Sequence, residues 1–404
     1  MGVLELLKND SEDEGSISNF QALSAVLAGN LGTGNISGMA IALTMGGPGS
    51  LIWMWIMAIL GAILKYSGCF LSLQYRVKNK EGEYVGGPMY YLSKGLGLKK
   101  IAVLFAIFAI FASFTVGNLV QVNSMTLPLA KMGVPLTVIV LGILLSVAVV
   151  LIGGLSRLAK VVATLVPLMT CIYLVASILI LFIFKAKLGG AVALIFASAF
   201  SLKTVASGAL GFGVSRAIIS GFERGIFATD AGCGIAPILQ SGAKSKDPFV
   251  EGVIAMIAPF IVMFICTVTA LVLIVTGAWP FSGEVSTNMC TWAFQTGLNH
   301  VLGKHIVILC LVLFAFTTII TWAYCGEKAC EYLFQNKAVK SFKYLYIAIL
   351  PLGTFFQTKL VWLLADISIG MMLVTNLIGI IGFSPKLINE TPKYSKDPKK
   401  TSSS

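Results

Sequence analysis

The sequence predicts an all-α integral membrane protein with about ten transmembrane helices, arranged as two inverted repeats of five helices, each repeat containing one broken helix. Three observations predict this fold class: the composition, the spacing of the apolar runs, and two glycine-rich interruptions at equivalent positions. Of the 404 residues, 57% are hydrophobic and 11% are charged. Soluble domains carry about 25% charged residues, so this chain lacks the polar side chains to cover a water-exposed surface.

The chain contains ten apolar segments, and about 20 apolar residues suffice to cross the hydrocarbon core of a bilayer. The ninth segment is the shortest and holds Pro351 in its middle. A further apolar stretch, Gly189–Ser207, is short and is expected to lie at the outer interface. The ten segments are Phe20–Thr44, Ser50–Tyr75, Ile101–Leu127, Val134–Leu151, Val161–Phe184, Gly208–Gly242, Phe249–Thr276, Gly303–Leu333, Phe342–Phe356 and Val361–Phe383.

The net charge of +12 arises mainly from alternate links between these segments. Lys and Arg in short loops stay in the cytoplasm, which predicts a multi-pass protein of the cell inner membrane with a cytoplasmic C-terminus. The basic charge is thus expected to set topology in the lipid bilayer, with no role in nucleic-acid binding. The basic links are Arg76–Lys100, Gly154–Lys160, Ala243–Pro248, Asn336–Ser341 and the tail after Ser384.

An internal repeat divides the chain. Gly32-Thr33-Gly34 is followed by Pro48, and Gly232-Cys233-Gly234 is followed by Pro248, so both landmarks recur after 200 residues. Five segments separate them, which requires the two halves to have opposite orientation. Chance matching in a chain with 41 glycines is the alternative. We expect an acidic tail (residues 1–19, without the basic start of a signal peptide), two repeats (20–184 and 185–383) and a basic tail (384–404).

The first interruption, Leu31–Gly38, places three glycines and several polar residues within an apolar segment. A glycine inside a helix costs about 1 kcal/mol relative to alanine, and an unsatisfied peptide group in lipid costs several kcal/mol. Gly34 and Gly38 have the spacing of close helix packing. The other interpretation is an unwound helix that binds a ligand, which the equivalent interruption in the second half favours.

The second interruption, Gly225–Gly234, contains Asp230. A carboxylate inside the membrane is a functional candidate: it can coordinate a cation, bind an ammonium group, pair with Arg224, or cap a half-helix. The N-terminus of a half-helix attracts a carboxylate, and carbonyl groups attract an ammonium group or Na⁺. Two facing interruptions therefore suit a zwitterion.

Enzyme and metal chemistry find no support in the sequence. The eight cysteines form no CxxC or CxxH pattern, and His300 and His305 do not share a helix face. The sequence contains no phosphate-binding loop, HExxH or GxSxG motif, so we expect neither an enzyme nor a cofactor beyond a coupling ion.

Several motifs resemble the alanine or glycine:cation symporter family, over nearly the whole chain and in the same order. The resemblance implies uptake of alanine or glycine coupled to Na⁺ or H⁺, on a leucine-transporter-like inverted repeat. The motifs are Gly32–Ile36, Gly46–Gly49, Gly82–Tyr91, Asn118–Asn123, Arg224–Phe227 running to Ala236-Pro237, Trp322–Glu327, Trp362 to Asp366, and Asn376-Leu377.

The resemblance also implies site residues, several of which have a second interpretation. Asn118, Gln121 and Asn123 can form interhelical hydrogen bonds without binding a ligand. Trp322 can be an ordinary packing residue, and the hydroxyls of Thr317 and Thr318 can donate to the backbone of their own helix. The implied substrate-binding residues are Thr33, Gly34, Asn35, Gln121, Phe227, Thr229, Asp230, Gly232 and Trp322, with Asn118 and Asn123 in support. The implied Na⁺ ligands are Thr33, Asn35, Thr317 and Thr318.

The chain departs from the family pattern at three places. Family members usually open with an additional helix, where this chain has a short acidic tail. Thr229-Asp230-Ala231-Gly232 stands where Asn-Glu-Ala-Gly is common, so the carboxylate is one methylene shorter. Gly68 stands where a glutamate commonly follows the lysine at Lys65, which leaves Lys65 without that local partner.

We therefore expect a secondary active transporter for sodium-coupled or proton-coupled symport of alanine, glycine or similar small neutral amino acids. Its partners are the amino acid, the coupling ion and the bilayer, with no obligate protein partner. A passive channel or facilitator, or a non-transporting sensor on the same fold, is the alternative. Concentrative uptake distinguishes the first reading from the others.

Overall fold

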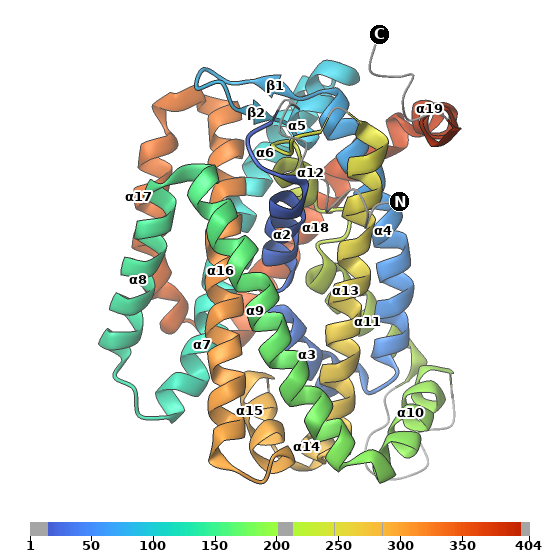
Figure 1. Ribbon diagram of the computed structural model, residues 1–404, viewed down its shortest axis with the longest axis vertical. Helices are drawn as coiled ribbons and strands as arrows, with labels where there is room; N and C mark the ends of the chain where they lie inside the picture. Colours follow the sequence, from blue (N-terminus) through green and yellow to red (C-terminus); the bar gives the residue numbers. More distant parts are fainter. Residues whose placement is uncertain (1–14, 201–212, 246, 285, 397–404) are drawn as a thin grey trace.

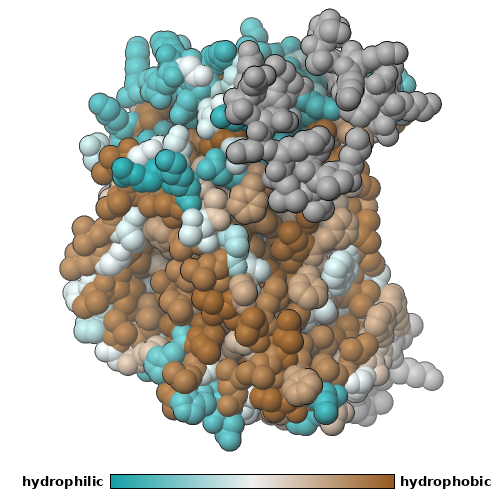
Figure 2. Space-filling model, in the orientation of Figure 1, coloured by the Kyte–Doolittle hydropathy of each residue, from teal (hydrophilic) through white to brown (hydrophobic). Residues whose placement is uncertain are grey.

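A computed structural model describes residues 15–200, 213–245, 247–284 and 286–396, which are mostly helical (Figure 1). Six helical stretches among these residues are long and apolar enough to cross a membrane. Hydrophobic side chains cover the middle of the visible face, and hydrophilic ones gather at the end that carries the hairpin β1–β2 (Figure 2). The described chain is thus a multi-pass helical membrane protein. The six stretches are 50–74, 99–131, 154–183, 248–275, 301–337 and 358–382.

The first predicted segment is a broken helix. Helix α2 (Asn19–Asn30) begins with a capping box, in which the Ser18 side chain accepts from the backbone N–H of Gln21 and the Gln21 side chain accepts from that of Ser18. The helix stops before Leu31, a short 3₁₀ turn η1 (Thr33–Asn35) follows, and α3 (Ser37–Gly46) resumes. The break falls where the glycines predict it.

The sixth predicted segment is broken as well, into α11 (Val214–Thr229) and α12 (Ile235–Gln240). Asp230, Gly232 and Gly234 have φ angles of 47°, 73° and 84°. This left-handed region is unfavourable for residues other than glycine, so Asp230 is held there by its surroundings. Residues 208–212 of the predicted segment lie outside the described residues.

Long helices surround the two broken ones. The third predicted segment is one rod from α6 through the π-helical turn η3 into α7, and this turn was not predicted. The bounds are α4 (Ser50–Gln74), α6 (Lys99–Phe114), η3 (Thr115–Leu119), α7 (Val120–Lys131), α8 (Leu136–Ile152), α9 (Gly154–Ile183), α13 (Pro248–Val275), α16 (Val301–Phe334) and α18 (Thr358–Gly382).

Two predicted segments have different bounds in the structure. Helix α9 begins at Gly154, so the expected link 154–160 is helical; Gly154 has φ +64° and makes the turn from α8 within two residues. The ninth segment, predicted as Phe342–Phe356, divides into α17 (Val339–Ile349) and the 3₁₀ helix η5 (Leu350–Thr354). Pro351, which lacks a backbone N–H, lies at this change.

Apart from the expected interfacial stretch, the short elements at both ends of the molecule were not predicted, because none has the length of a membrane span. Helix α10 (Lys185–Phe200) covers the described part of the expected interfacial stretch, and α19 occupies much of the expected C-terminal tail. The other short elements are β1 (Val77–Lys78), β2 (Tyr84–Val85), α5 (Pro88–Tyr90), the π-helical η2 (Tyr91–Gly95), α14 (Ala278–Phe281), α15 (Ser286–Gly297), η4 (Gln335–Lys337) and α19 (Ser384–Lys396).

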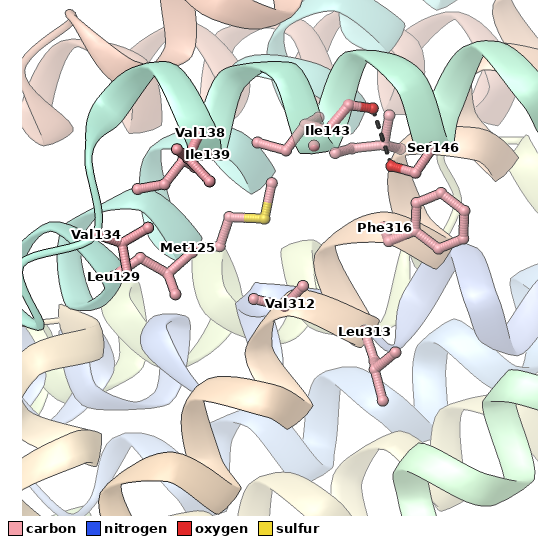
Figure 3. Close-up of a pocket in the computed structure, with 12 residues that line it drawn as sticks. Met125, Leu129, Val134, Val138, Ile139, Ile143, Ser146, Val312, Leu313 and Phe316 are labelled. Atoms are coloured by element: carbon pink, nitrogen blue, oxygen red, sulfur yellow. Dashed lines mark hydrogen bonds between the residues drawn. The ribbon is translucent and has the colours of Figure 1, made fainter.

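An apolar groove of about 370 Å³ lies between α7, α8 and α16 (Figure 3). Met125, Val138 and Phe316 are among its lining residues. The hydroxyl of Ser146, which also lines the groove, donates its hydrogen to the carbonyl of Ile143 on the same helix, 3.0 Å away. This surface suits contact with hydrocarbon.

Helix α4 is the support of the second broken helix. A Cβ added to Gly61 would lie 2.6 Å from Cβ of Ala231, and one added to Gly68 would lie 2.7 Å from Cγ of Pro237. Real Cβ atoms do not come that close, so both glycines are required for the approach of the two segments. Position 68 has no room for a glutamate in this arrangement.

We predict that Gly117→Ala destabilises the protein, because the added Cβ would lie 2.1 Å from Cβ of Trp322 on α16. Overpacking of this kind typically costs about 1–3 kcal/mol. The midpoint of thermal unfolding in detergent measures the effect. Gly142→Ala on α8, where nothing lies within 4 Å of the added atom, is the control and is expected to unfold no earlier than the parent. Equal loss in both variants would contradict the packing account.

Candidate functional site

The two helix breaks meet in the interior of the molecule. The side-chain Nδ2 of Asn30, at the end of α2, donates to the carbonyl oxygen of Thr229, at the end of α11, over 2.6 Å. Both residues are buried. The C-terminal ends of two half-helices therefore lie side by side, and each end carries partial negative charge. Such a place attracts a cation or an ammonium group.

Gln121 on α7 holds the first break. Its Oε1 accepts from both the backbone N–H and the hydroxyl of Thr33, each at 3.0 Å, and its Nε2 donates to the carbonyl of Val116 in the π-helical turn. A Cβ added to Gly32 would lie 2.9 Å from Gln121 Oε1 and 2.8 Å from Thr318 Oγ1. Gly32 thus allows α7 and α16 to reach the break together.

Side chains satisfy the carbonyl groups that the first break frees. Asn35 Nδ2 donates to the carbonyl of Asn30 (2.6 Å), and the hydroxyl of Ser37 donates to that of Thr33 (2.6 Å). The thiol of Cys266 on α13 lies 3.4 Å from Asn35 Oδ1. An interrupted helix is tolerated in apolar surroundings when its peptide groups find such partners.

The hydroxyls of Thr317 and Thr318 on α16 point in different directions. Thr318 Oγ1 donates to the carbonyl of Ala28 on α2, 2.8 Å away, one turn before the first break. Thr317 Oγ1 lies 3.1 Å from each of the carbonyl oxygens of Leu313 and Phe314 on its own helix. Thr318 therefore faces the first break, whereas Thr317 makes the local hydrogen bond that the sequence left as its alternative.

Two aromatic rings cover the breaks. A Cβ added to Gly34 would lie 2.7 Å from the ring of Phe227, so that ring rests on the backbone of the first break. The Phe227 and Trp362 ring centroids are 4.6 Å apart. Trp362 of α18 also contacts Gly38, 3.3 Å from the position of an added Cβ. Sequence reasoning placed Trp362 in a motif and did not give it this covering position.

Trp322 is fully buried and packs against Gly117 in the π-helical turn. Gly117 and Gln121 are four residues apart on one rod, so Trp322 lies along the helix that presents Gln121 to the first break.

An ion pair lies beside the aromatic rings. Arg224 on α11 pairs with Asp366 on α18, and its guanidinium lies 4.9 Å from the Trp362 ring centroid and 5.6 Å from that of Phe227. The suggestion that Arg224 pairs with Asp230 is therefore wrong. A cavity of about 490 Å³ adjoins this layer; besides Arg224, Trp362 and Asp366 it is lined by Ile41, Met45, Glu223, Ser286, Thr358, Lys359 and Leu363.

Side chains from α18 and η2 form hydrogen bonds that hold the second break. The carbonyl of Gly232 accepts from Asn376 Nδ2 at 2.8 Å, and the Tyr91 hydroxyl donates to Asn376 Oδ1. Asp230 is 3% exposed, and its Oδ2 lies 3.9 Å from the position of a Cβ added to Gly29. The carboxylate thus faces α2 just before the first break.

Asn118 and Asn123 bond to a different part of the molecule. Asn118 Nδ2 donates to the carbonyl of Tyr346 at 2.9 Å, and Asn123 Nδ2 donates to those of Gly353 and Phe356 at 3.0 and 2.9 Å. These bonds join the rod α6–α7 to α17 and η5. They are the interhelical hydrogen bonds that the sequence left as the alternative for these residues.

The end that carries β1 and β2 is closed by backbone contacts. Backbone N–H groups of Ser16 and Ile17 donate to the carbonyl of Gly242, and that of Lys244 donates to the carbonyl of Ile17. The Arg76 guanidinium donates to the carbonyls of residues 241, 243 and 245. With the aromatic layer on the opposite side, both breaks are shut off from solvent, as their burial reflects.

Comparison with known proteins gives a family and a fold. The sequence profile of the sodium:alanine symporter family matches residues 2–404. The chain is 36% identical to the sodium/alanine symporter AgcS of Methanococcus maripaludis, over 96% of this chain and 86% of that protein. It is 39% identical to an uncharacterized transporter of Haemophilus influenzae, with the same two coverages. It is 31% identical to the probable sodium/glutamine symporter GlnT of Bacillus subtilis, over 96% of this chain and 81% of that protein.

Solved structures agree on the fold. The transporter MhsT in complex with L-phenylalanine matches with a TM-score of 0.65 at 13% identity, over 92% of this chain and 89% of that one. A manganese transporter of Eremococcus coleocola matches with a TM-score of 0.56 at 14% identity, over 96% and 76%. These likenesses show the leucine-transporter-like fold and carry no information on the substrate.

We predict that Asn30→Ala destabilises the protein because it leaves the buried Thr229 carbonyl without its donor. A buried polar group that loses its partner typically costs about 1–3 kcal/mol. Asn336→Ala, at an exposed asparagine whose side chain donates to Glu81, is the control and is expected to change little. Thermal unfolding of the purified variants measures both, and an Asn30 variant as stable as the parent would contradict the proposed contact between the breaks.

Proposed function

Because the chain belongs to the sodium:alanine symporter family, we propose that it is a secondary active transporter that carries alanine, glycine or a similar small neutral amino acid together with Na⁺. The family consists of transporters and not of enzymes. The observation that carries the proposal is the Asn30–Thr229 hydrogen bond, which brings the two breaks together. A ligand between them contacts both halves of the protein.

The charge distribution at the breaks suits the two ends of an amino acid. The carbonyl ends of α2 and α11 attract the ammonium group, and the N-terminus of α3, which begins at Ser37, attracts the carboxylate. Proposed binding residues besides these ends are those predicted from the sequence. They are Thr33, Gly34, Asn35, Gln121, Phe227, Thr229, Asp230, Gly232 and Trp322, to which we add Trp362 as the ring that covers Phe227.

Aromatic rings pack tightly against the first break. The Phe227 ring already touches the backbone of Gly34, and the Trp362 ring lies against the Phe227 ring with the two centroids 4.6 Å apart. This supports a substrate with a short side chain. A single methylene in such a pocket changes the binding free energy by about 1–3 kcal/mol, so alanine, glycine and serine are all compatible with it.

Sodium is proposed to bind next to Thr318. Its hydroxyl and the Ala28 carbonyl are 2.8 Å apart and belong to α16 and α2, so an ion between them would join the two helices. Na⁺ takes oxygen ligands, and the unwound segment supplies further carbonyls. Thr33, Asn35 and Thr317 complete the proposed set, Thr317 after a change of its hydroxyl direction.

The proposal includes ten transmembrane segments in a five-plus-five inverted repeat, with repeats at 20–184 and 185–383. It is supported by the two breaks and by α4 and α13, which follow the breaks at equivalent positions and pack on each other. We place the protein in the cell inner membrane with the hairpin end and the C-terminus in the cytoplasm. Arg76, Lys78 and Lys80 lie at that end.

We predict that proteoliposomes containing the protein accumulate labelled alanine or glycine against its gradient when Na⁺ is higher outside. Replacing Na⁺ by K⁺ at fixed pH should abolish accumulation. Accumulation that persists in K⁺ and follows a pH gradient would reject sodium coupling and identify protons as the coupling ion. Uptake that only equilibrates would identify a facilitator, and no uptake of small neutral amino acids would reject the function.

We predict that Thr318→Val raises the Na⁺ concentration for half-maximal uptake at least about tenfold, equivalent to about 1.4 kcal/mol. Valine keeps the shape and removes the hydroxyl that faces Ala28. Thr126→Val is the control, because the Thr126 hydroxyl donates to Val122 on its own helix. A parent-like Na⁺ dependence in Thr318→Val would exclude this hydroxyl as a sodium ligand.

A further inference from the structure

Lys65 is a buried lysine in the middle of the molecule. It lies on α4 and is 2% exposed, and its Nζ has no hydrogen-bond partner among the residues that the structure describes. An ammonium group inside a membrane protein is unfavourable unless an opposite charge or a polar cavity compensates it. Lys65 therefore needs a counter-charge.

The carboxylate of Asp230 is in the same position. Its Oδ2 is buried and also has no hydrogen-bond partner among the described residues. The thiols on the same two segments, those of Cys69 and Cys233, are buried. Burial disfavours the thiolate form, so neither thiol supplies a charge.

Backbone packing brings the two residues onto facing segments. Gly61, one turn before Lys65, contacts Ala231, and Gly68, less than one turn after it, contacts Pro237. Positions 61, 65 and 68 share one face of a helix. Lys65 therefore lies on the face of α4 that spans the second break from Ala231 to α12.

We propose that Lys65 is the resident cation of the second break: it neutralises Asp230, so that no coupling sodium ion binds this carboxylate. The inference rests on the sodium coupling proposed above and refines it, because it confines sodium to the first break beside Thr318. Lys65 is thus a positioning residue, which acts on the transport site through Asp230. This pairing connects the two departures from the family pattern at positions 68 and 230. Gly68 leaves Lys65 without a glutamate on its own helix, and Asp230 on the second break is the carboxylate that takes its place.

A double-mutant cycle in thermal stability tests the pairing without any transport assay. Lys65→Met and Asp230→Asn each leave one buried charge uncompensated, and each should lower the unfolding midpoint in detergent. The double variant should unfold closer to the parent than the less stable single variant does. The control cycle is Lys131→Met with Glu284→Gln, an ion pair in which the Lys131 side chain is 52% exposed, and its effects should add. Additive losses at Lys65 and Asp230 would overturn the pairing.

Sodium dependence of uptake tests the functional half. The parent should show a Hill coefficient for Na⁺ of about one. Lys65→Met should raise the Na⁺ concentration for half-maximal uptake. Its Hill coefficient for Na⁺ should be nearer to about two, because a second sodium ion takes the place of the lost ammonium group. Because Asp230 is also a proposed substrate ligand, the double variant is followed by the thermal stabilisation that Na⁺ gives it, and the coefficient of that stabilisation should return to about one, since no carboxylate is left to neutralise. A Hill coefficient of about two in the parent that falls to about one in Asp230→Asn would show that Asp230 binds sodium beside Lys65, and would overturn the proposal. If the parent shows no sodium-coupled uptake, the proposed function fails while the stability cycle still decides the pairing.

Discussion

The contact between the ends of two interrupted helices is the constraint on which the rest of the structure depends. A peptide group in apolar surroundings must have a partner, so a helix can stop at mid-membrane only where other segments supply donors and acceptors. Asn30 supplies one across the two breaks, Gln121 supplies another from α7, and Asn376 supplies a third from α18. Each break is therefore a product of its neighbours as much as of its own glycines.

Glycines determine how closely those neighbours approach. Gly32 admits Thr318 and Gln121, Gly34 admits the Phe227 ring, and Gly61 and Gly68 admit the second break to α4. The same close packing that shuts the site from solvent also sets the face of α4 that carries Lys65 against the second break, where we propose that Lys65 compensates Asp230. Polar groups that would be unfavourable alone in lipid are thereby compensated inside the protein.

The sequence predicted what depends on local pattern. Apolar length located the six long helical stretches that can cross a membrane, and glycines among polar residues located both breaks, because these signals lie within a few adjacent residues. It did not predict the π-helical turn at Thr115–Leu119, the ion pair between Arg224 and Asp366, or the stacking of Trp362 on Phe227. These features depend on contacts between residues more than a hundred positions apart, or on strain that packing imposes. For Asn118 and Asn123 the sequence offered two interpretations, and only the positions of α17 and η5 distinguish them.

Amide hydrogen exchange of the purified protein tests the central claim most directly, because it reports on the backbone of both interruptions at once. Residues 31–36 and 230–234 should exchange readily in the absence of ligand as the site opens. They should become protected together when alanine and Na⁺ are both present, with a weaker effect of either alone. Exchange at both interruptions that is as slow as in the neighbouring helices without ligand, and unchanged by alanine with Na⁺, would contradict a binding site built from two broken helices.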